Sequence, residues 1–157
     1  GTAGEEMASQ RYAKRVQKEL KQLQGSPPPG ISLVSAEDLG RWIVRIIGSE
    51  GTLYAGHQYD VQFRYPPMYP MEAPEVIFVG QHIPMHPHIY SNGHICLSIL
   101  YDSWSPALTA TSVCLSLQSM LSSNQSLTRP SDDAMYVSQC HGKSPKDTRW
   151  WFHDDKC

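Results

Sequence analysis

The spacing of apolar residues near the start of the chain predicts a helix. Residues 9–24 place one apolar stripe at helical spacing, formed by Tyr12, Val16, Leu20 and Leu23. Basic side chains cover the other faces of this segment. The helix should end at Gly25, because the prolines at 27–29 forbid its continuation.

The spacing then changes to patterns that are typical of strands. Three runs alternate or are rich in β-branched residues, with Gly or Pro between them: residues 41–48, 53–65 and 75–80. Their short connections favour an antiparallel meander. A helical apolar pattern returns in residues 105–123, with Thr109 or Thr111 as the expected N-cap.

The chain of 157 residues is long enough for one domain with a single core. We expect a flexible N-terminus over residues 1–8, a core domain over 9–123 and a divergent C-terminal region of the same domain over 124–157. The predicted class is α+β: an N-terminal helix, an antiparallel β-meander, a long functional loop, a following helix and an atypical C-terminal tail.

Composition changes this picture little. Hydrophobic residues make up 40% of the chain and charged residues 18%, with a net charge of −2, so neither nucleic acid nor a membrane surface is an expected partner. No apolar run approaches the ~18 residues of a membrane span. No charged-then-apolar leader predicts secretion. The expected location is therefore the cytoplasm, the nucleus or both.

The segment HPHIYSNGHICLSIL (86–100) carries the candidate chemistry: His86, His88, His94 and Cys96. Three interpretations fit its residue types. A zinc site has suitable ligands, but the spacing matches none of the common patterns. A core cysteine fits the apolar neighbours of Cys96. A reactive cysteine fits the polar flanks, and a Cys hydrolase would use His94 as base, although no third orienting group is evident.

Four segments in this order resemble the ubiquitin-conjugating enzymes: YPMEAPEVIF (69–78), His86-Pro87-His88 in place of the family's His-Pro-Asn, SNGHICLSIL (91–100) and WSPALTATSVCLSL (104–117). The resemblance implies the ubiquitin-conjugating-enzyme fold, with Cys96 accepting ubiquitin as a thioester from an activating enzyme. It implies no cofactor and no metal, since the activating enzyme uses the ATP. The exchange needs a thiolate but no dedicated base.

The resemblance also assigns roles around Cys96. His88 stands where the family has asparagine and is either a catalytic hydrogen-bond donor or a brace for the loop. The expected active-site support is His86, Pro87, His94, Asp132 and Asp133. The expected surface for the activating enzyme and for RING or U-box ligases is Lys14, Arg15, Lys18, Met71, Ser105, Pro106 and Ala107.

The tail TRWWFHDDKC (148–157), together with His-Pro-His, is similar to the W-type class of this family. That class attaches a single ubiquitin to the α-amino group of accessible protein N-termini, which are the implied substrates. Trp150 and Trp151 either recognise the acceptor or pack against the sheet. Two alternatives remain: a conjugating enzyme for another ubiquitin-like modifier, or a catalytically silent scaffold of the same fold.

Overall fold

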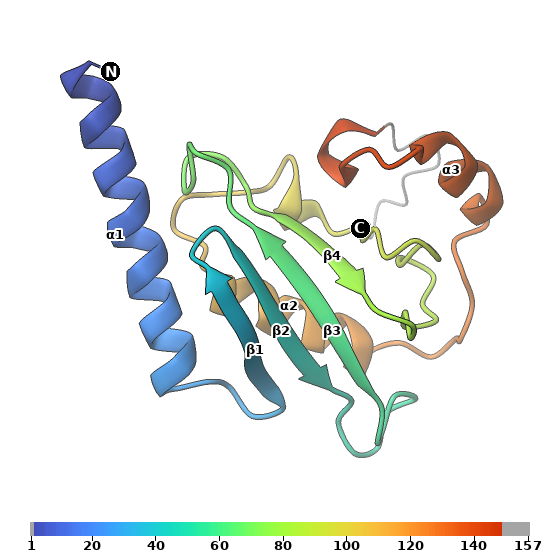
Figure 1. The fold of residues 1–157 in the computed structure, drawn as a ribbon. Helices are drawn as coiled ribbons and strands as arrows, with labels where there is room; N and C mark the ends of the chain where they lie inside the picture. The colour runs from blue at the N-terminus through green and yellow to red at the C-terminus, as the bar shows by residue number, and fades with distance from the viewer. Residues whose placement is uncertain (1, 149–157) are drawn as a thin grey trace.

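The computed structural model describes residues 2–148 of the chain. The elements are, in order, α1 (Ala3–Gly25), β1 (Ile31–Asp38), β2 (Arg41–Ile47), β3 (Gln58–Arg64), β4 (Glu75–Val79), the 3₁₀ helix η1 (Ser98–Leu100), α2 (Ala110–Ser122), α3 (Asp133–Cys140) and the 3₁₀ helix η2 (Pro145–Asp147). Figure 1 shows α1 beside the sheet, α2 behind it and α3 beyond β4. Within this described range, no helix is long and apolar enough to cross a membrane. The predicted α+β class is confirmed.

Helix α1 begins earlier than the apolar stripe indicated. The Thr2 hydroxyl accepts a hydrogen bond from the Glu5 backbone N–H, and the Glu5 carboxylate accepts one from the Thr2 N–H, which is a capping box. Residues 3–8 therefore belong to α1, whereas the apolar stripe placed the start of this helix at residue 9. The helix ends at Gly25, as predicted. The buried residues of α1 are Val16, Glu19 and Leu23.

The four strands form one antiparallel sheet in the order β1-β2-β3-β4, so the predicted meander is confirmed with one additional strand. The strand predicted over residues 53–65 begins later than expected, because residues 50–54 form turns and β3 begins at Gln58. Sequence patterning missed β1 altogether. Only Ile31 of this strand is fully buried, and its pairing with β2 is irregular at two places, so its alternation is obscured.

One apolar core unites the sheet with α2. The pleat of β2 sends alternate residues inward, namely Trp42, Val44 and Ile46. Helix α2 contributes Val113, Leu117 and Leu121. The Thr109 hydroxyl accepts a hydrogen bond from the Ser112 N–H at 3.1 Å, which confirms Thr109 as the N-cap of α2. The core therefore holds α2 in place, and α2 carries part of the site described below.

The C-terminal region contains α3 and η2, where the sequence predicted either a loop plus a short helix or a mobile tail. Tyr136 of α3 stacks on Tyr90, with ring centroids 4.0 Å apart. These two residues and Cys140 form a second, smaller apolar cluster. Helix α3 is thus attached to the segment that carries the cysteine motif. Trp150 and Trp151 lie outside the described residues, so their predicted role stays a prediction.

Candidate active site

The motif segment folds back on itself as a short hairpin. The Gly93 N–H donates to the Tyr90 carbonyl and the Tyr90 N–H to the His94 carbonyl, each at 2.9 Å. One step further out, the Cys96 N–H donates to the His88 carbonyl at 2.8 Å. The hairpin therefore holds the backbone of His88 beside Cys96, although neither residue belongs to the sheet.

His86 ties the base of this hairpin to α2. Its Nδ1 accepts a hydrogen bond from the His88 N–H at 2.9 Å, and its Nε2 lies 3.2 Å from the Met120 carbonyl oxygen. These partners require a neutral ring with its hydrogen on Nε2. Burial lowers the pKa of His86 to about 4, and the hydrogen bond to Met120 opposes this only in part. His86 is therefore a structural support of the site that functions uncharged.

We expect the free energy of unfolding to fall as the pH decreases from about 6.5 toward 4. The unfolded chain protonates His86 near its ordinary pKa of 6.5, whereas the folded protein resists protonation until about 4. Acid therefore favours the unfolded state in this window, with a loss of roughly 2 kcal/mol by pH 5. Urea unfolding at pH 7 and pH 5 measures the effect. His86→Gln should reduce the pH dependence, whereas His82→Gln at an exposed position should not; equal slopes in all three proteins would contradict the assignment.

Cys96 lines a groove of about 810 Å³ that runs along α2 and the segment after it. The polar residues of α2 and that segment that line it are Ser116, Ser119, Ser123, Asn124, Gln125 and Ser126. His86, Pro87 and His88 line it from the hairpin. No Asp, Glu, Lys or Arg of the described chain lines this groove. The sequence predicted a polar surrounding for Cys96, and the groove supplies one without formal charge.

Cys96 itself is only 4% exposed, so it is less accessible than its polar flanks indicated. It is also disulfide-bonded in the structure, so its thiol becomes available only after reduction. Cys114 and Cys140 are free and buried. Any assay of Cys96 therefore begins with a reduction step.

His94 does not serve Cys96. Its Nδ1 lies 2.7 Å from the Tyr136 hydroxyl and 3.8 Å from the Cys140 sulfur, both on α3. It lines a separate groove between the sheet and α3, not the groove of Cys96. Burial lowers the pKa of His94. The Cys hydrolase interpretation therefore lacks its base, and His94 is placed as a support that joins the hairpin to α3.

The four residues proposed for zinc do not assemble a metal site. His86 and His94 use their ring nitrogens for protein partners that lie on α2 and α3, in different directions. Among residues 2–148, no group of three or more His, Cys, Asp or Glu side chains is placed to hold a metal ion. The geometry of these residues thus favours the hairpin support described above.

Asp132 and Asp133 contact the turn of the hairpin. Asp132 accepts a hydrogen bond from the Tyr90 hydroxyl at 2.9 Å, and Asp133 accepts one from the Ser91 N–H at 2.8 Å. Burial and Asp132 raise the pKa of Tyr90, so its hydroxyl stays a donor. Both carboxylates therefore brace the loop that carries Cys96, and neither lines the groove beside it.

Sequence reasoning missed two residues that support the same segment. Arg129 donates to the backbone carbonyls of Ile83, Pro84 and Ile89. The Tyr101 hydroxyl donates to the Ile95 carbonyl at 2.7 Å. The sequence around Arg129 gave no sign of this role, because its acceptors are backbone carbonyls 40 to 46 residues away in the chain.

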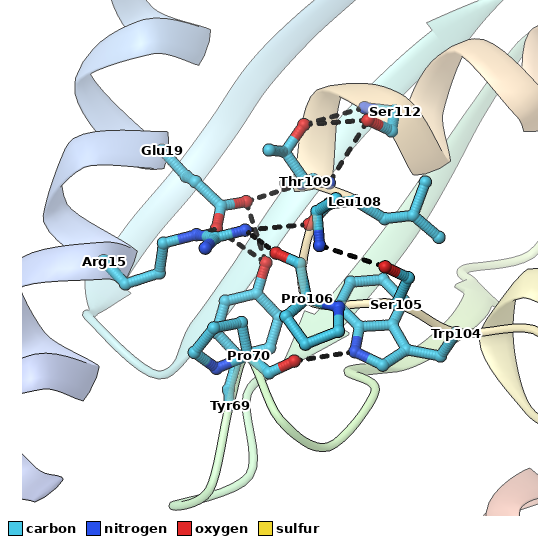
Figure 2. Close-up of polar contacts among 12 residues, drawn as sticks. Arg15, Glu19, Tyr69, Pro70, Trp104, Ser105, Pro106, Leu108, Thr109 and Ser112 are labelled. Carbon is cyan, nitrogen blue, oxygen red and sulfur yellow. Dashed lines mark hydrogen bonds and ion pairs between the residues drawn. The ribbon is translucent and has the colours of Figure 1, made fainter.

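The residues predicted to bind the activating enzyme and ligases come from three segments that meet beside α1. Those with exposed side chains are Lys14, Lys18, Met71, Pro106 and Ala107. The Trp104 indole N–H donates to the Pro70 carbonyl at 2.8 Å, which joins two of the segments (Figure 2). Ser105 is half-buried, and its hydroxyl accepts from the Ala107 N–H. The structure thus brings the predicted residues together on one surface.

Arg15 differs from the other residues of that surface. Its guanidinium turns toward loop 104–109 and donates to the carbonyls of Pro106 at 2.7 Å and Leu108 at 3.0 Å (Figure 2). Its Nε also contacts the Glu19 carboxylate at 2.7 Å. Arg15 is therefore engaged within the protein, whereas Lys14 and Lys18 are exposed.

A four-stranded meander flanked by a long N-terminal helix, with a His-Pro-His hairpin that presents a cysteine to a groove along α2, defines a ubiquitin-conjugating fold. The model of the ubiquitin-conjugating enzyme family matches residues 15–153. The chain therefore belongs to the ubiquitin-conjugating enzyme family.

Similar proteins agree with this assignment and with the W-type class. A Dictyostelium discoideum protein named probable ubiquitin-conjugating enzyme E2 W is 57% identical over 145 residues, covering 92% of this chain and 97% of that one. Ubiquitin-conjugating enzyme E2 W of Caenorhabditis elegans is 53% identical over 150 residues, covering 94% and 98%. The crystal structure of ubiquitin-conjugating enzyme E2 UbcA1 from Agrocybe aegerita has a TM-score of 0.82 and 44% identity, covering 86% and 98%.

The protein is accordingly a transferase of the ubiquitin pathway. Enzymes of this family carry ubiquitin on a cysteine as a thioester, and their partners are ubiquitin, an activating enzyme and ligases. The predicted fold, enzyme class and family are confirmed.

Proposed function

We propose that Cys96 is the residue that carries ubiquitin. Cys114 lies in the apolar core, and burial raises the pKa of its thiol to about 12, which disfavours a thiolate. Cys140 is buried against His94 on α3. Of these three cysteines, only Cys96 lines the groove beside His-Pro-His.

Loading is then an exchange between two sulfurs. The Cys96 thiolate attacks the terminal carbonyl carbon of ubiquitin, which arrives as a thioester on the activating enzyme. A new carbon–sulfur bond forms at Cys96, and the thiolate of the activating enzyme leaves. Because the incoming acyl group is already activated, no dedicated base is needed, and the turning of His94 away from Cys96 is consistent with this step.

We further propose that the acceptor is a protein α-amino group, which receives a single ubiquitin. The observation that carries this proposal is that, among the described residues, no Asp, Glu, Lys or Arg lines the groove beside Cys96. At pH 7 roughly a tenth of an α-amine is uncharged, against well under a thousandth of a lysine. A nearby carboxylate would favour the ammonium form further. A groove that does not remove the proton therefore favours the amine that has already lost it.

We infer that His88 assists this second step. It lines the same groove as Cys96, and its backbone carbonyl already holds the Cys96 N–H, so that amide is not available to the oxyanion. An imidazole N–H can donate one hydrogen bond to the oxyanion that forms when the amine attacks. The amine then loses its proton to solvent, the amide forms and the Cys96 thiolate leaves.

Single-turnover discharge of the loaded enzyme tests the acceptor. Two peptides of matched composition serve as acceptors, one N-acetylated with an internal lysine and one lysine-free with an open N-terminus. We expect discharge onto the open N-terminus to be more than about tenfold faster at pH 7. Equal rates, or faster discharge onto lysine, would overturn the proposal. A parallel loading assay with a ubiquitin-like protein in place of ubiquitin tests which of the two modifiers the enzyme carries.

Two variants separate the contributions within this assay. His88→Asn restores the family's residue, and we expect slower discharge with unchanged loading if the imidazole donates to the oxyanion. Truncation after Thr148 removes Trp150 and Trp151 while retaining the contact between the Thr148 and Tyr136 hydroxyls. We expect this truncation to weaken acceptor capture more than loading, because loading depends on α1 and Cys96.

A further inference from the structure

The most buried carboxylate described lies on α1 and does not line the groove of Cys96. Glu19 is 3% exposed. Its buried negative charge is compensated, because its partners are hydrogen-bond donors. It accepts hydrogen bonds from the Tyr69 hydroxyl at 2.7 Å, from the Arg15 Nε at 2.7 Å and from the Ala110 N–H at 2.6 Å (Figure 2). A carboxylate so deeply buried is stable only when its acceptors are satisfied, so these donors are structural requirements.

These partners belong to different segments of the chain. Tyr69 lies in the loop before β4, and Ala110 is the first residue of α2. Arg15 extends the network to loop 104–109 through its bonds to the Pro106 and Leu108 carbonyls. Glu19 therefore joins α1, both loops of the proposed binding surface and the start of the helix that lines the Cys96 groove.

We propose that Glu19 and Arg15 are positioning residues that fix loop 104–109 against α1 and so hold the surface to which the activating enzyme binds. The inference rests on the proposed binding surface formed by Lys14, Lys18, Met71, Pro106 and Ala107. Arg15 therefore has a different role from Lys14 and Lys18. Arg15 acts through the loop carbonyls, whereas the exposed lysines supply the positive charge that contacts the activating enzyme.

Geometry distinguishes this role from that of a surface cation. The planar guanidinium donates to two carbonyls and to a carboxylate at once, while it lies 5.9 Å from the centre of the Tyr69 ring. A lysine carries the same charge on a single nitrogen and cannot reproduce this fork. Arg15→Lys therefore preserves the charge of the surface and removes the positioning.

The test compares Glu19→Gln and Arg15→Lys with matched exposed controls on the same helix, Glu6→Gln and Arg11→Lys. Amide hydrogen exchange of the free protein reports the network at the end of this loop, because the Ala110 N–H at the start of α2 donates to Glu19. We expect this amide to exchange about tenfold faster or more in both network variants. In charging assays we expect KM for the activating enzyme to rise roughly tenfold in both, with kcat and discharge of loaded enzyme within about twofold. Both controls should match the parent.

Each other outcome is informative. If Arg15→Lys retains the parent exchange rate and KM, Arg15 acts by charge alone and the inference fails. If exchange accelerates but KM does not change, the network is only structural, and the inference also fails. Met71→Ala tests the binding surface separately: an unchanged KM there would show that the surface is wrong, whatever the network does.

Glu19→Gln places an amide donor among donors, which disfavours folding, so Tyr69→Phe is the second variant. It removes one hydrogen bond to Glu19 and leaves the contact with Arg15 intact. We expect smaller changes in the same direction, and a parent-like KM together with faster exchange would again overturn the inference.

Discussion

Replacing Cys96 with alanine should abolish the reductant-sensitive adduct that forms when the protein is incubated with ATP, activating enzyme and ubiquitin. No other described cysteine can substitute for it. Cys114 is fully buried with its thiol pKa raised to about 12, and Cys140 is held in the cluster of α3. We therefore expect complete loss of the adduct, measured on a non-reducing gel after prior reduction of the enzyme and removal of the reductant.

Cys96→Ser provides a positive form of the same experiment. Serine presents an oxygen nucleophile at the same position, so ubiquitin should be trapped as an oxyester. This ester should survive a thiol reductant, because an oxyester is a poorer acyl donor than a thioester. It should be cleaved by mild base. A band that is equally sensitive to reductant in the serine variant would show that a different cysteine carries ubiquitin.

The matched control for both variants is Cys140→Ala, which removes a cysteine that does not line the groove. We expect it to load ubiquitin fully and to be less stable than the parent, because the Cys140 side chain is buried. Mass spectrometry of the loaded parent should locate the modifier on Cys96. Finding it on Cys114, Cys140 or Cys157 would overturn the assignment.

Gly93→Ala should strongly destabilise the hairpin that carries Cys96. Gly93 adopts φ = +91° at the turn of the hairpin, a conformation that L-residues rarely adopt. An added Cβ would lie 2.0 Å from the Phe78 carbonyl oxygen, and backbone cannot move aside as a flexible side chain can. Its own carbonyl also accepts the Phe78 N–H at 2.9 Å, which fixes the hairpin to β4. Backbone strain at residue 93 and the steric clash with Phe78 would therefore both disrupt the contact between the hairpin and β4.

We expect Gly93→Ala to lower the free energy of unfolding by about 3 kcal/mol or more. Because the hairpin would detach from β4, the variant should also load ubiquitin slowly even where it remains folded. Urea unfolding measures the first effect and charging kinetics the second. Both effects would be absent only if the hairpin could adjust its backbone without leaving β4. A variant with the parent's free energy of unfolding and the parent's loading rate would therefore contradict the argument.

Gly56→Ala is the matched control for this substitution. Gly56 also has a positive φ, +80°, but no atom lies within 4 Å of the position of its added Cβ. It therefore carries the backbone strain without the clash, and we expect a loss of about 1 kcal/mol with normal loading. The difference between the two variants measures the close approach of the hairpin to Phe78.

The sequence by itself determined the elements whose signals are local. The apolar stripe of α1, the alternation of β2 and β4 and the cap at Thr109 each depend on residues within a few positions of one another. The four ordered motifs indicated the family and the candidate cysteine at Cys96, because their residues and spacing can be seen along the chain. The start of α1 was missed although the capping box of Thr2 and Glu5 was a local signal.

Only the tertiary structure decided which side chains meet. His94 stands two positions from Cys96 in the chain, yet it turns to Tyr136 on α3. Arg15, predicted as part of a charged surface, bonds carbonyls 91 and 93 residues away. Periodicity cannot reveal such pairs, because it reports which face of an element is apolar and not which distant segment packs against it. The topology of the sheet, the docking of α2 and the attachment of α3 bring those partners together.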